Sequence, residues 1–197
     1  MLTLHPDRFF AAIRPLFSGK FTTGQLASLN ALLSEGANVL PNVQALAYLL
    51  ATAWHETGHT MMPVREGGQG RGYDYGQALD MGGGPGRRIP YKTPPMLYYY
   101  GRGYVQLTWR CNYQAMGRIT GTDLLNNPDL AMQPVVATQI AVQGMLRGYF
   151  TGKRLKDYFP TPSGKHDPLN ARRIINGMDC AARIAGYYNT FLTALLA

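Results

Sequence analysis

Cysteine, charge and long apolar runs are all scarce in this sequence, and each scarcity excludes a class of protein. Only two cysteines, Cys111 and Cys180, occur among the 197 residues, so neither a disulfide framework nor a cysteine-based zinc site can form. The longest apolar run, residues 45–54, is about half of what a membrane-spanning helix needs. We therefore predict a globular protein without stable membrane insertion, with both cysteines as small buried side chains.

Charged residues make up only 15% of the chain, and the two signs are unequal. The 19 lysines and arginines outnumber the 11 aspartates and glutamates, which leaves a net charge of +8 at pH 7. This balance favours an acidic partner, such as a nucleic acid, an anionic membrane surface or an anionic cell wall. The basic residues are scattered and no DNA-reading helix is evident, so we expect no nucleic-acid partner. Charges precede any apolar run in the first ten residues, so we expect no signal peptide.

Apolar residues form 46% of the chain, and their spacing near 3.6 residues predicts helices along most of its length. The expected helices cover residues 5–17, 23–36, 41–57, 110–118, 134–150, 168–175 and 179–196. Gly36 is a candidate helix end and Asp179 a candidate N-cap. Glycine fills nine positions of residues 67–86, where the period is lost, whereas 98–108 favours a short strand or hairpin. The sequence therefore predicts one mostly α domain over residues 1–197, with a small β-hairpin and loop region.

The segment His55–His59 matches H-E-x-x-H, a pattern typical of zinc peptidases. In that interpretation His55 and His59 bind the metal one helical turn apart, and Glu56 is the base. Gly58 would weaken a helix between the two ligands, and no third ligand motif follows. We therefore expect His59 to pack or hydrogen-bond rather than bind a metal, and keep a metallopeptidase as an alternative.

The carboxylates suggest a different chemistry. Only three glutamates are present, and Glu56 lies on the apolar stripe that should face inward. Glu66 follows ten residues later, at the mouth of the glycine-rich loop. One partly buried and one more solvated carboxylate are what acid–base glycoside hydrolysis requires. The alternative is that Glu56 is a structural carboxylate and Glu66 a surface charge beside Arg65.

Aromatic and polar side chains gather in residues 99–113. Glycines on both sides of Arg102 predict a tight backbone, and flat aromatic faces can stack on sugar rings. Aromatic clusters also form ordinary cores, so the segment alone leaves both interpretations open. The candidate sugar contacts here are Tyr99, Arg102, Gln106, Trp109 and Asn112, and Thr108 lies in the same segment.

Together these residues resemble glycoside hydrolase family 19, the chitinase-like enzymes that include many phage endolysins. Residues 55–58 resemble the family's H-E-T-G helix end. Residues 99–113 match its signature Y-Y-G-R-G-x-x-Q-L-S/T-x-x-x-N-Y. The remaining similar blocks, in family order, are 123–130, 134–136, 174–177 and 183–188.

The resemblance implies a mostly helical, lysozyme-like two-lobed fold with a sugar-binding cleft, and inversion at the anomeric carbon without a metal or cofactor. Glu56 would be the general acid, and Thr108 would hold the attacking water. The base of plant-type members lies in a loop that this chain has replaced, so we choose Glu66, with Asp74 in reserve. Other positions that match the family's cleft are Gln106, Asn112, Asn176 and Arg183.

Chitin and peptidoglycan are both β-1,4-linked chains of N-acetylated aminosugars, so one cleft could serve either. The basic charge, the short chain and the expected lack of a signal peptide favour peptidoglycan in an anionic envelope. We therefore expect a monomeric, muramidase-like endolysin that stays in the host cytoplasm until lysis and then reaches the periplasm and cell wall. The alternatives are a chitinase and a wall-binding module without chemistry. The helix 179–196 is expected to dock on the core rather than act on membranes.

Overall fold

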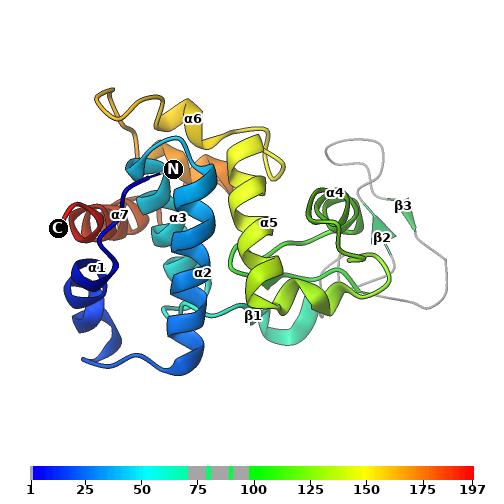
Figure 1. Cartoon of the computed structure of the whole chain (residues 1–197). Helices are drawn as coiled ribbons and strands as arrows, with labels where there is room; N and C mark the ends of the chain where they lie inside the picture. Colours follow the sequence, from blue (N-terminus) through cyan, green and yellow to red (C-terminus); the bar gives the residue numbers. More distant parts are fainter. Residues whose placement is uncertain (1, 71–78, 81–88, 91–97) are drawn as a thin grey trace.

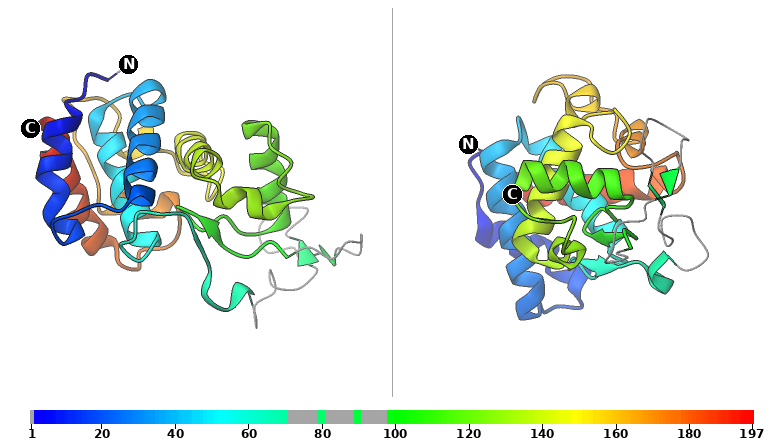
Figure 2. Two further views of the ribbon diagram at one scale, coloured as in Figure 1. Left: turned by 60° about the horizontal axis from the view of Figure 1, so that its bottom comes forward. Right: turned by 90° about the vertical axis from the view of Figure 1, so that its right-hand side faces the viewer.

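The computed structural model describes residues 2–70, 79–80, 89–90 and 98–197, and helices dominate it (Figure 1). The helices are α1 (Pro6–Ile13), α2 (Thr23–Val39), α3 (Val43–Glu56), α4 (Arg110–Thr120), α5 (Pro134–Arg147), α6 (Leu155–Tyr158) and α7 (Ala181–Leu196). Helices α1, α2, α3 and α7 form one lobe, α4 lies in the other, and α5 lies between them (Figures 1 and 2). This arrangement confirms the predicted mostly α, two-lobed architecture.

The strands are short and form two antiparallel pairs in the described part of the chain. Strand β1 (Val64–Arg65) pairs with β4 (Arg102–Gly103), and β2 (Leu79–Asp80) pairs with β3 (Ile89–Pro90). Residues 98–108 were predicted to form a short strand or a hairpin, and they contain the short strand β4. Both residues of β4 pair with the distant β1, and within the segment itself a single bridge joins Arg102 and Leu107.

The core is centred on α3, whose side chains are buried nearly all round. Helix α7 packs along α3, while α2 packs against α5. Tyr188 of α7 joins Tyr48 of α3 in an aromatic cluster around Phe159, with ring centroids 5.2–6.3 Å apart. Each large buried side chain contributes about 1.5–3 kcal/mol, so this face fixes α7 on the core, as predicted. None of the described helices is long and apolar enough to span a bilayer.

The second helix does not end at Gly36, where the sequence suggested a stop. Helix α2 continues to Val39, and Gly36 is buried within it. A Cβ at Gly36 would collide with the side chain of Leu46 on α3. The glycine is therefore there for close packing between α2 and α3 rather than for termination.

Near the C-terminus the structure departs from the predictions. Residues 168–175 form a short 3-10 helix, η5 (Asn170–Ile174), instead of a longer α-helix. Helix α7 is preceded by Cys180, which has a left-handed φ of 57° and makes no side-chain cap, while the Asp179 carboxylate bonds to Arg172. Cys180 is exposed and Cys111 is only half-buried, so neither is the buried side chain that was expected.

The end of α3 explains how the sequence after Glu56 folds. The amide of Gly58 donates to the carbonyl of His55, and the amide of His59 donates to the carbonyl of Trp54 at 2.9 Å. Gly58 has a left-handed φ of 58°, which completes a Schellman motif. The ring of His59 stacks on Trp54 at 4.9 Å, the side-chain contact that often accompanies this motif. Helix α3 therefore stops at Glu56 and leaves its carboxylate at a helix end.

Candidate active site

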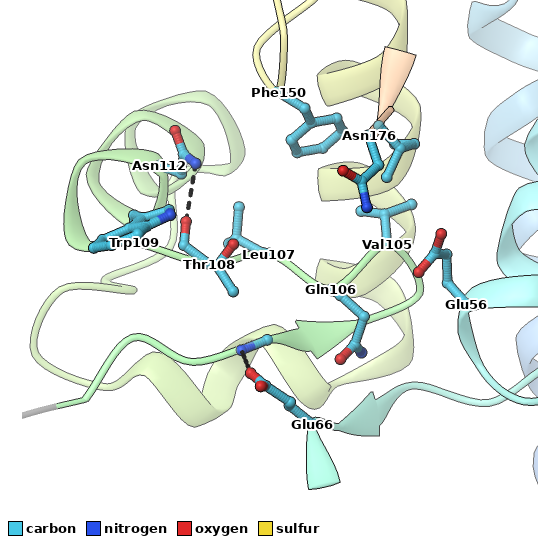
Figure 3. Close-up of a pocket in the computed structure, with 12 residues that line it drawn as sticks. Glu56, Glu66, Val105, Gln106, Leu107, Thr108, Trp109, Asn112, Phe150 and Asn176 are labelled. Atoms are coloured by element: carbon cyan, nitrogen blue, oxygen red, sulfur yellow. Dashed lines mark hydrogen bonds between the residues drawn. The ribbon is translucent and has the colours of Figure 1, made fainter. Parts of the chain in front are cut away.

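A cavity of about 420 Å³ lies between the two lobes, and both candidate carboxylates face it (Figure 3). Glu56 reaches it from the end of α3, and Glu66 reaches it from the segment after β1. In the close-up, Gln106 lies between these two side chains. The structure thus brings together seven predicted site residues, which are Glu56, Glu66, Gln106, Thr108, Trp109, Asn112 and Asn176.

Glu56 is held by an arginine that sequence reasoning missed. Its side chain is 15% exposed, and Oε1 accepts a hydrogen bond from Nη1 of Arg172, whose side chain is only 3% exposed. Arg172 also donates from Nε to the Asp179 carbonyl at 3.1 Å, and its Nη2 lies 3.3 Å from Oδ2 of Asp179. Burial lowers the pKa of Arg172, but the two carboxylates raise it more, and the net shift is upward. Arg172 is therefore a permanent cation that fixes the direction of the Glu56 carboxylate.

The two histidines of H-E-x-x-H do not lie one turn apart on a helix, because α3 ends between them. His59 has a left-handed φ of 68°, stacks on Trp54 and hydrogen-bonds through Nε2 to the Tyr187 hydroxyl at 2.9 Å. His59 thus packs and hydrogen-bonds as the sequence predicted. Burial lowers the pKa of His55, and the adjacent Glu56 carboxylate offsets only part of this lowering. Within the described residues, no group of three or more histidine, cysteine or carboxylate side chains is arranged to hold a metal ion.

Glu66 is fixed to Gly101, the residue before β4, through the backbone and through its own carboxylate. The amide of Glu66 donates to the Gly101 carbonyl at 2.8 Å, and the amide of Gly101 donates to Oε2 of Glu66 at 3.0 Å. A Cβ at Gly101 would lie 2.7 Å from Oε1 of Gln106. A side chain here would push Gln106 away, so glycine lets Gln106 approach this backbone closely, in agreement with the predicted tight backbone.

The polar wall of the cavity carries unusual backbone conformations. Gln106 and Trp109 have left-handed φ angles of 53° and 70°, and they flank Thr108. Gln106 donates from Nε2 to the Val64 carbonyl at 3.2 Å, and Asn112 donates from Nδ2 to the Thr108 carbonyl at 2.9 Å. Left-handed non-glycine residues cost about 1–3 kcal/mol each and cluster at functional sites. The strain here fits a wall that is shaped for a ligand.

Three predicted contacts do not line this cavity. Tyr99 and Arg102 are buried, and the Tyr99 hydroxyl donates to the Leu125 carbonyl at 2.9 Å. Their side chains support the wall from behind, so they are positioned to brace it rather than to touch a ligand. Arg183 is exposed on α7 and is absent from the cavity lining. Asp74, the reserve base, lies outside the described residues.

The cavity also has apolar lining that the sequence did not indicate. Phe150 follows α5, and Ile175 follows η5, next to the predicted Asn176. Because helix and 3-10 helix meet only in the folded chain, no local pattern could have placed Phe150 beside Asn176. The combination of an apolar wall and a polar wall is typical of a small-ligand cavity.

Comparison with known proteins identifies the family of this chain. Residues 25–156 match the model of glycoside hydrolase family 19, described as chitinase class I. Endochitinase 1 of Theobroma cacao is 34% identical over 115 residues, which are 58% of this chain and 36% of that protein. Inactive chitinase-like protein 1 of Hevea brasiliensis is 36% identical over 118 residues, which are 59% of this chain and 35% of that protein. The chain thus spans about a third of the length of these plant relatives.

The fold resembles solved structures over nearly the whole chain. Chitinase C from Streptomyces griseus HUT6037 superimposes with a TM-score of 0.66 at 20% identity, covering 98% of this chain and 77% of that one. At this identity the likeness concerns the fold, and it agrees with the predicted architecture. The family model covers two thirds of the sequence, including Glu56, Glu66 and residues 99–113, so the chain belongs to glycoside hydrolase family 19.

Proposed function

We propose that this protein is an endolysin that hydrolyses the β-1,4 glycan backbone of bacterial peptidoglycan with inversion. The observation that carries the proposal is the cavity itself, into which two carboxylates project from different elements. An inverting enzyme needs one carboxyl group on each side of the scissile bond, with room for a water molecule. Family membership and the polar wall around Thr108 support the same chemistry.

Glu56 is the general acid in this proposal. Arg172 bonds to Oε1, and within the described residues Oε2 has no such partner. That oxygen can carry the proton that is transferred to the glycosidic oxygen as the bond breaks. Arg172 keeps the carboxyl group directed at the cavity, and a fixed direction is what proton transfer within hydrogen-bond distance requires.

Glu66 is the general base in this proposal. Its Oε2 accepts the Gly101 amide, which holds the carboxylate still at the cavity wall opposite Glu56. Glu66 would take a proton from a water molecule held by Thr108, and that water would attack the anomeric carbon from the face opposite to the leaving group. Gln106, Asn112 and Asn176 would hydrogen-bond to the sugar and hold it between the carboxylates.

The choice of substrate rests on charge. The protein carries a net charge of +8, which suits a wall polymer with peptide carboxylates and associated anionic phosphates. We accordingly propose that it acts as a monomer during host lysis, in the host cytoplasm first and at the cell wall after lysis. The alternative is hydrolysis of neutral chitin oligomers, which the names of the plant relatives favour.

The first experiment is a digest of purified peptidoglycan by the wild type and the variants Glu56→Gln and Glu66→Gln. Glu35→Gln, the same change on α2 outside the cavity, is the matched control. Mass spectrometry and reducing-end analysis identify the products, and NMR of fresh products reports the anomer. We expect reducing N-acetylmuramic acid ends of inverted configuration from the wild type and control, and a loss of at least about a hundredfold in both other variants.

Each other outcome has a defined meaning. Activity in a folded Glu56→Gln protein would overturn the mechanism. Loss in Glu56→Gln alone would move the base, with Asp74 tested next. Cleavage of chitin oligomers but not of peptidoglycan would establish the chitinase alternative. Peptide fragments with intact glycan strands, abolished by a chelator, would favour a metallopeptidase.

A further inference from the structure

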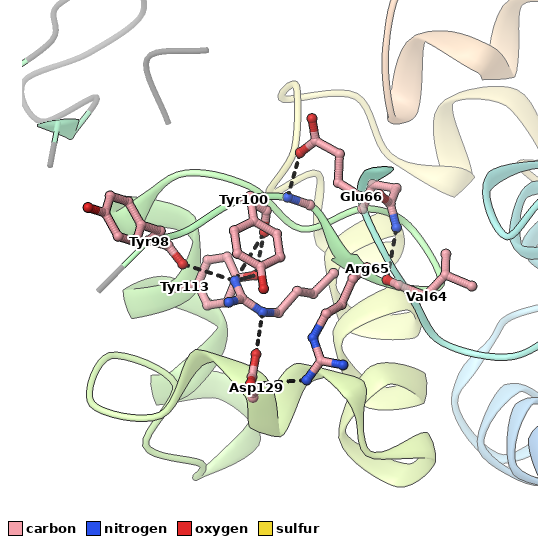
Figure 4. A network of polar contacts seen from close by, with 10 residues as sticks. Val64, Arg65, Glu66, Tyr98, Tyr100, Tyr113 and Asp129 are labelled. Atoms are coloured by element: carbon pink, nitrogen blue, oxygen red, sulfur yellow. Dashed lines mark hydrogen bonds and ion pairs between the residues drawn. The ribbon is translucent and has the colours of Figure 1, made fainter. Parts of the chain in front are cut away.

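Two arginines face each other across the strand pair that carries Glu66. Arg65 of β1 and Arg102 of β4 are directly opposed in the antiparallel register. Like charges in this arrangement destabilise a strand pair. Asp129, from the 3-10 helix η4 (Pro128–Met132), accepts from both, with Oδ2 at 3.0 Å from Nη2 of Arg65 and Oδ1 at 2.7 Å from Nε of Arg102 (Figure 4). One carboxylate thus links the two strands.

The Arg102 side chain is buried, with only 5% of its surface exposed, and it organises the backbone before β4. Its Nη1 donates to the carbonyls of Tyr98 and Tyr100 at 3.0 and 3.3 Å, and its guanidinium lies 3.6 Å from the centroid of the Tyr100 ring. The Tyr113 hydroxyl also donates to the Tyr100 carbonyl at 2.7 Å. A buried cation needs a compensating charge, and Asp129 supplies it.

The arginines are adjacent in sequence to the hydrogen bonds that hold the candidate base. Arg65 directly precedes Glu66, and Gly101 directly precedes Arg102. Glu66 and Gly101 are joined by a backbone bond of 2.8 Å and by the carboxylate–amide bond of 3.0 Å. Any change in the separation of the two strands therefore acts on the direction of the Glu66 carboxylate.

We propose that Asp129, with Arg65 and Arg102, forms a clamp that positions Glu66 for the reaction. Asp129 is half-exposed and does not line the cavity, so it acts on the reaction through the strand pair and is a positioning residue. The inference rests on the proposed function because Glu66 is the base there. The clamp itself is a statement about strand pairing and has a readout that does not need activity.

The test compares Asp129→Asn with Asp157→Asn. Both remove one exposed carboxylate that pairs with arginine, but Asp157 lies on α6, where its partner is Arg154 at 3.7 Å. We expect Asp129→Asn to lower kcat by about tenfold or more with KM little changed, because small misplacements of a catalytic group are costly. The limb of the kcat–pH profile that reports Glu66 should shift as well. Asp157→Asn should match the wild type, and Asp129→Glu should recover part of the loss.

A double-mutant cycle separates the clamp from general damage to the fold. In Asp129→Asn the opposed arginines repel each other without compensation, so adding Arg65→Gln should restore part of kcat. Purely additive losses would contradict the clamp. Circular dichroism melts of all variants show whether each protein is folded at the assay temperature.

Amide hydrogen exchange tests the clamp even if no substrate is cleaved. The Gly101 amide is protected by the Glu66 carboxylate, so Asp129→Asn should speed its exchange while amides of α3 stay unchanged. Unchanged exchange at Gly101, together with unchanged kcat, would overturn the inference. Faster exchange in a protein that cleaves neither glycan would preserve the clamp and refute the proposed function alone.

Discussion

The position of Phe150 in the cavity wall depends on a glycine in α5. Gly144 lies in the interior of α5, and a Cβ there would collide with the Phe150 ring. Thr151, which follows Phe150 in the chain, donates from its hydroxyl to the Arg173 carbonyl at 2.5 Å. This bond joins the loop after α5 to η5. Glycine within a helix costs about 1 kcal/mol relative to alanine. Gly144 and Thr151 therefore hold the Phe150 ring where it faces the cavity, at a cost in the stability of α5.

We predict that this ring supplies a flat face for a sugar. Phe150→Leu keeps an apolar side chain but removes the face, so KM for glycan oligomers should rise roughly two- to twelvefold, equivalent to about 0.5–1.5 kcal/mol. Phe150→Trp should retain a low KM. Phe10→Leu, at a partly buried aromatic residue of α1 remote from the cavity, is the control. Equal KM values for all four proteins would leave Phe150 with a packing role only.

At the scale of single residues, the sequence predicted those site residues that lie in a recognisable motif. Glu56, Gln106, Thr108 and Asn112 lie in short patterns, and the cavity contains all four. Arg172 could not be predicted, because it meets Glu56 across 116 positions of the chain. A buried ion pair of this kind depends on the tertiary contacts that bring η5 to the end of α3, and no local periodicity encodes it.

At the scale of elements, helix ends matter more than helix interiors for this site. The Schellman motif at Gly58 stops α3 so that Glu56 stands at the cavity. Capping residues act locally, so Asn42, which accepts the Ala45 amide at 2.8 Å, starts the same helix by an equally local interaction. The length of α3, and hence the place of Glu56, is set by residues outside the helix.

A pair of glycine substitutions tests this point. Gly58→Ala puts a side chain at a left-handed φ of 58°, so we expect a loss of about 1–2 kcal/mol in the free energy of unfolding. Gly186→Ala lies within α7, where a Cβ would meet nothing within 4 Å, so we expect a gain of up to about 1 kcal/mol. Urea titrations measure both. Equal effects of the two changes would mean that Gly58 does not terminate α3.

The errors in predicting elements share one physical cause. Gly36 was a poor stop signal because close contact with Leu46 requires glycine inside α2. Asp179 does not cap α7 because its carboxylate is bonded to Arg172. The short strand within 98–108 was predicted, but the sequence did not indicate its distant partner β1. In the first two cases a contact between distant segments overrides a sound local preference, whereas long apolar helices such as α3 and α5 were predictable from their period.

At the scale of the whole molecule, positive charge is concentrated in one segment, residues 147–173. Within residues 147–173, which also supply Phe150, the only acidic residues are Asp157 and Asp167. The exposed cations of this segment are Arg147, Lys153, Arg154, Lys156, Lys165 and Arg173. An exposed basic segment attracts an anionic polymer and leaves a neutral one unaffected.

Salt dependence therefore distinguishes the two candidate substrates. Screening shortens from about 10 Å at 0.1 M salt to about 3 Å at 1 M, so binding to purified sacculi should weaken steeply as salt rises. Hydrolysis of neutral chitin oligomers should change little. The triple variant Lys153→Gln, Lys156→Gln and Lys165→Gln should lose most of this salt dependence. A matched triple at α1, Arg8→Gln, Arg14→Gln and Lys20→Gln, should retain it, because those exposed cations lie on or beside α1, outside the basic segment 147–173.

Sacculi with amidated carboxylates provide the second control, since they keep the glycan but lose negative charge. We expect the wild type to bind them with the weak salt dependence of the lysine variant. If salt acted equally on intact and amidated sacculi, the net charge would not contribute to wall recognition. The same conclusion would follow if both triple variants behaved alike, and the case for peptidoglycan over chitin would then rest on the product analysis alone.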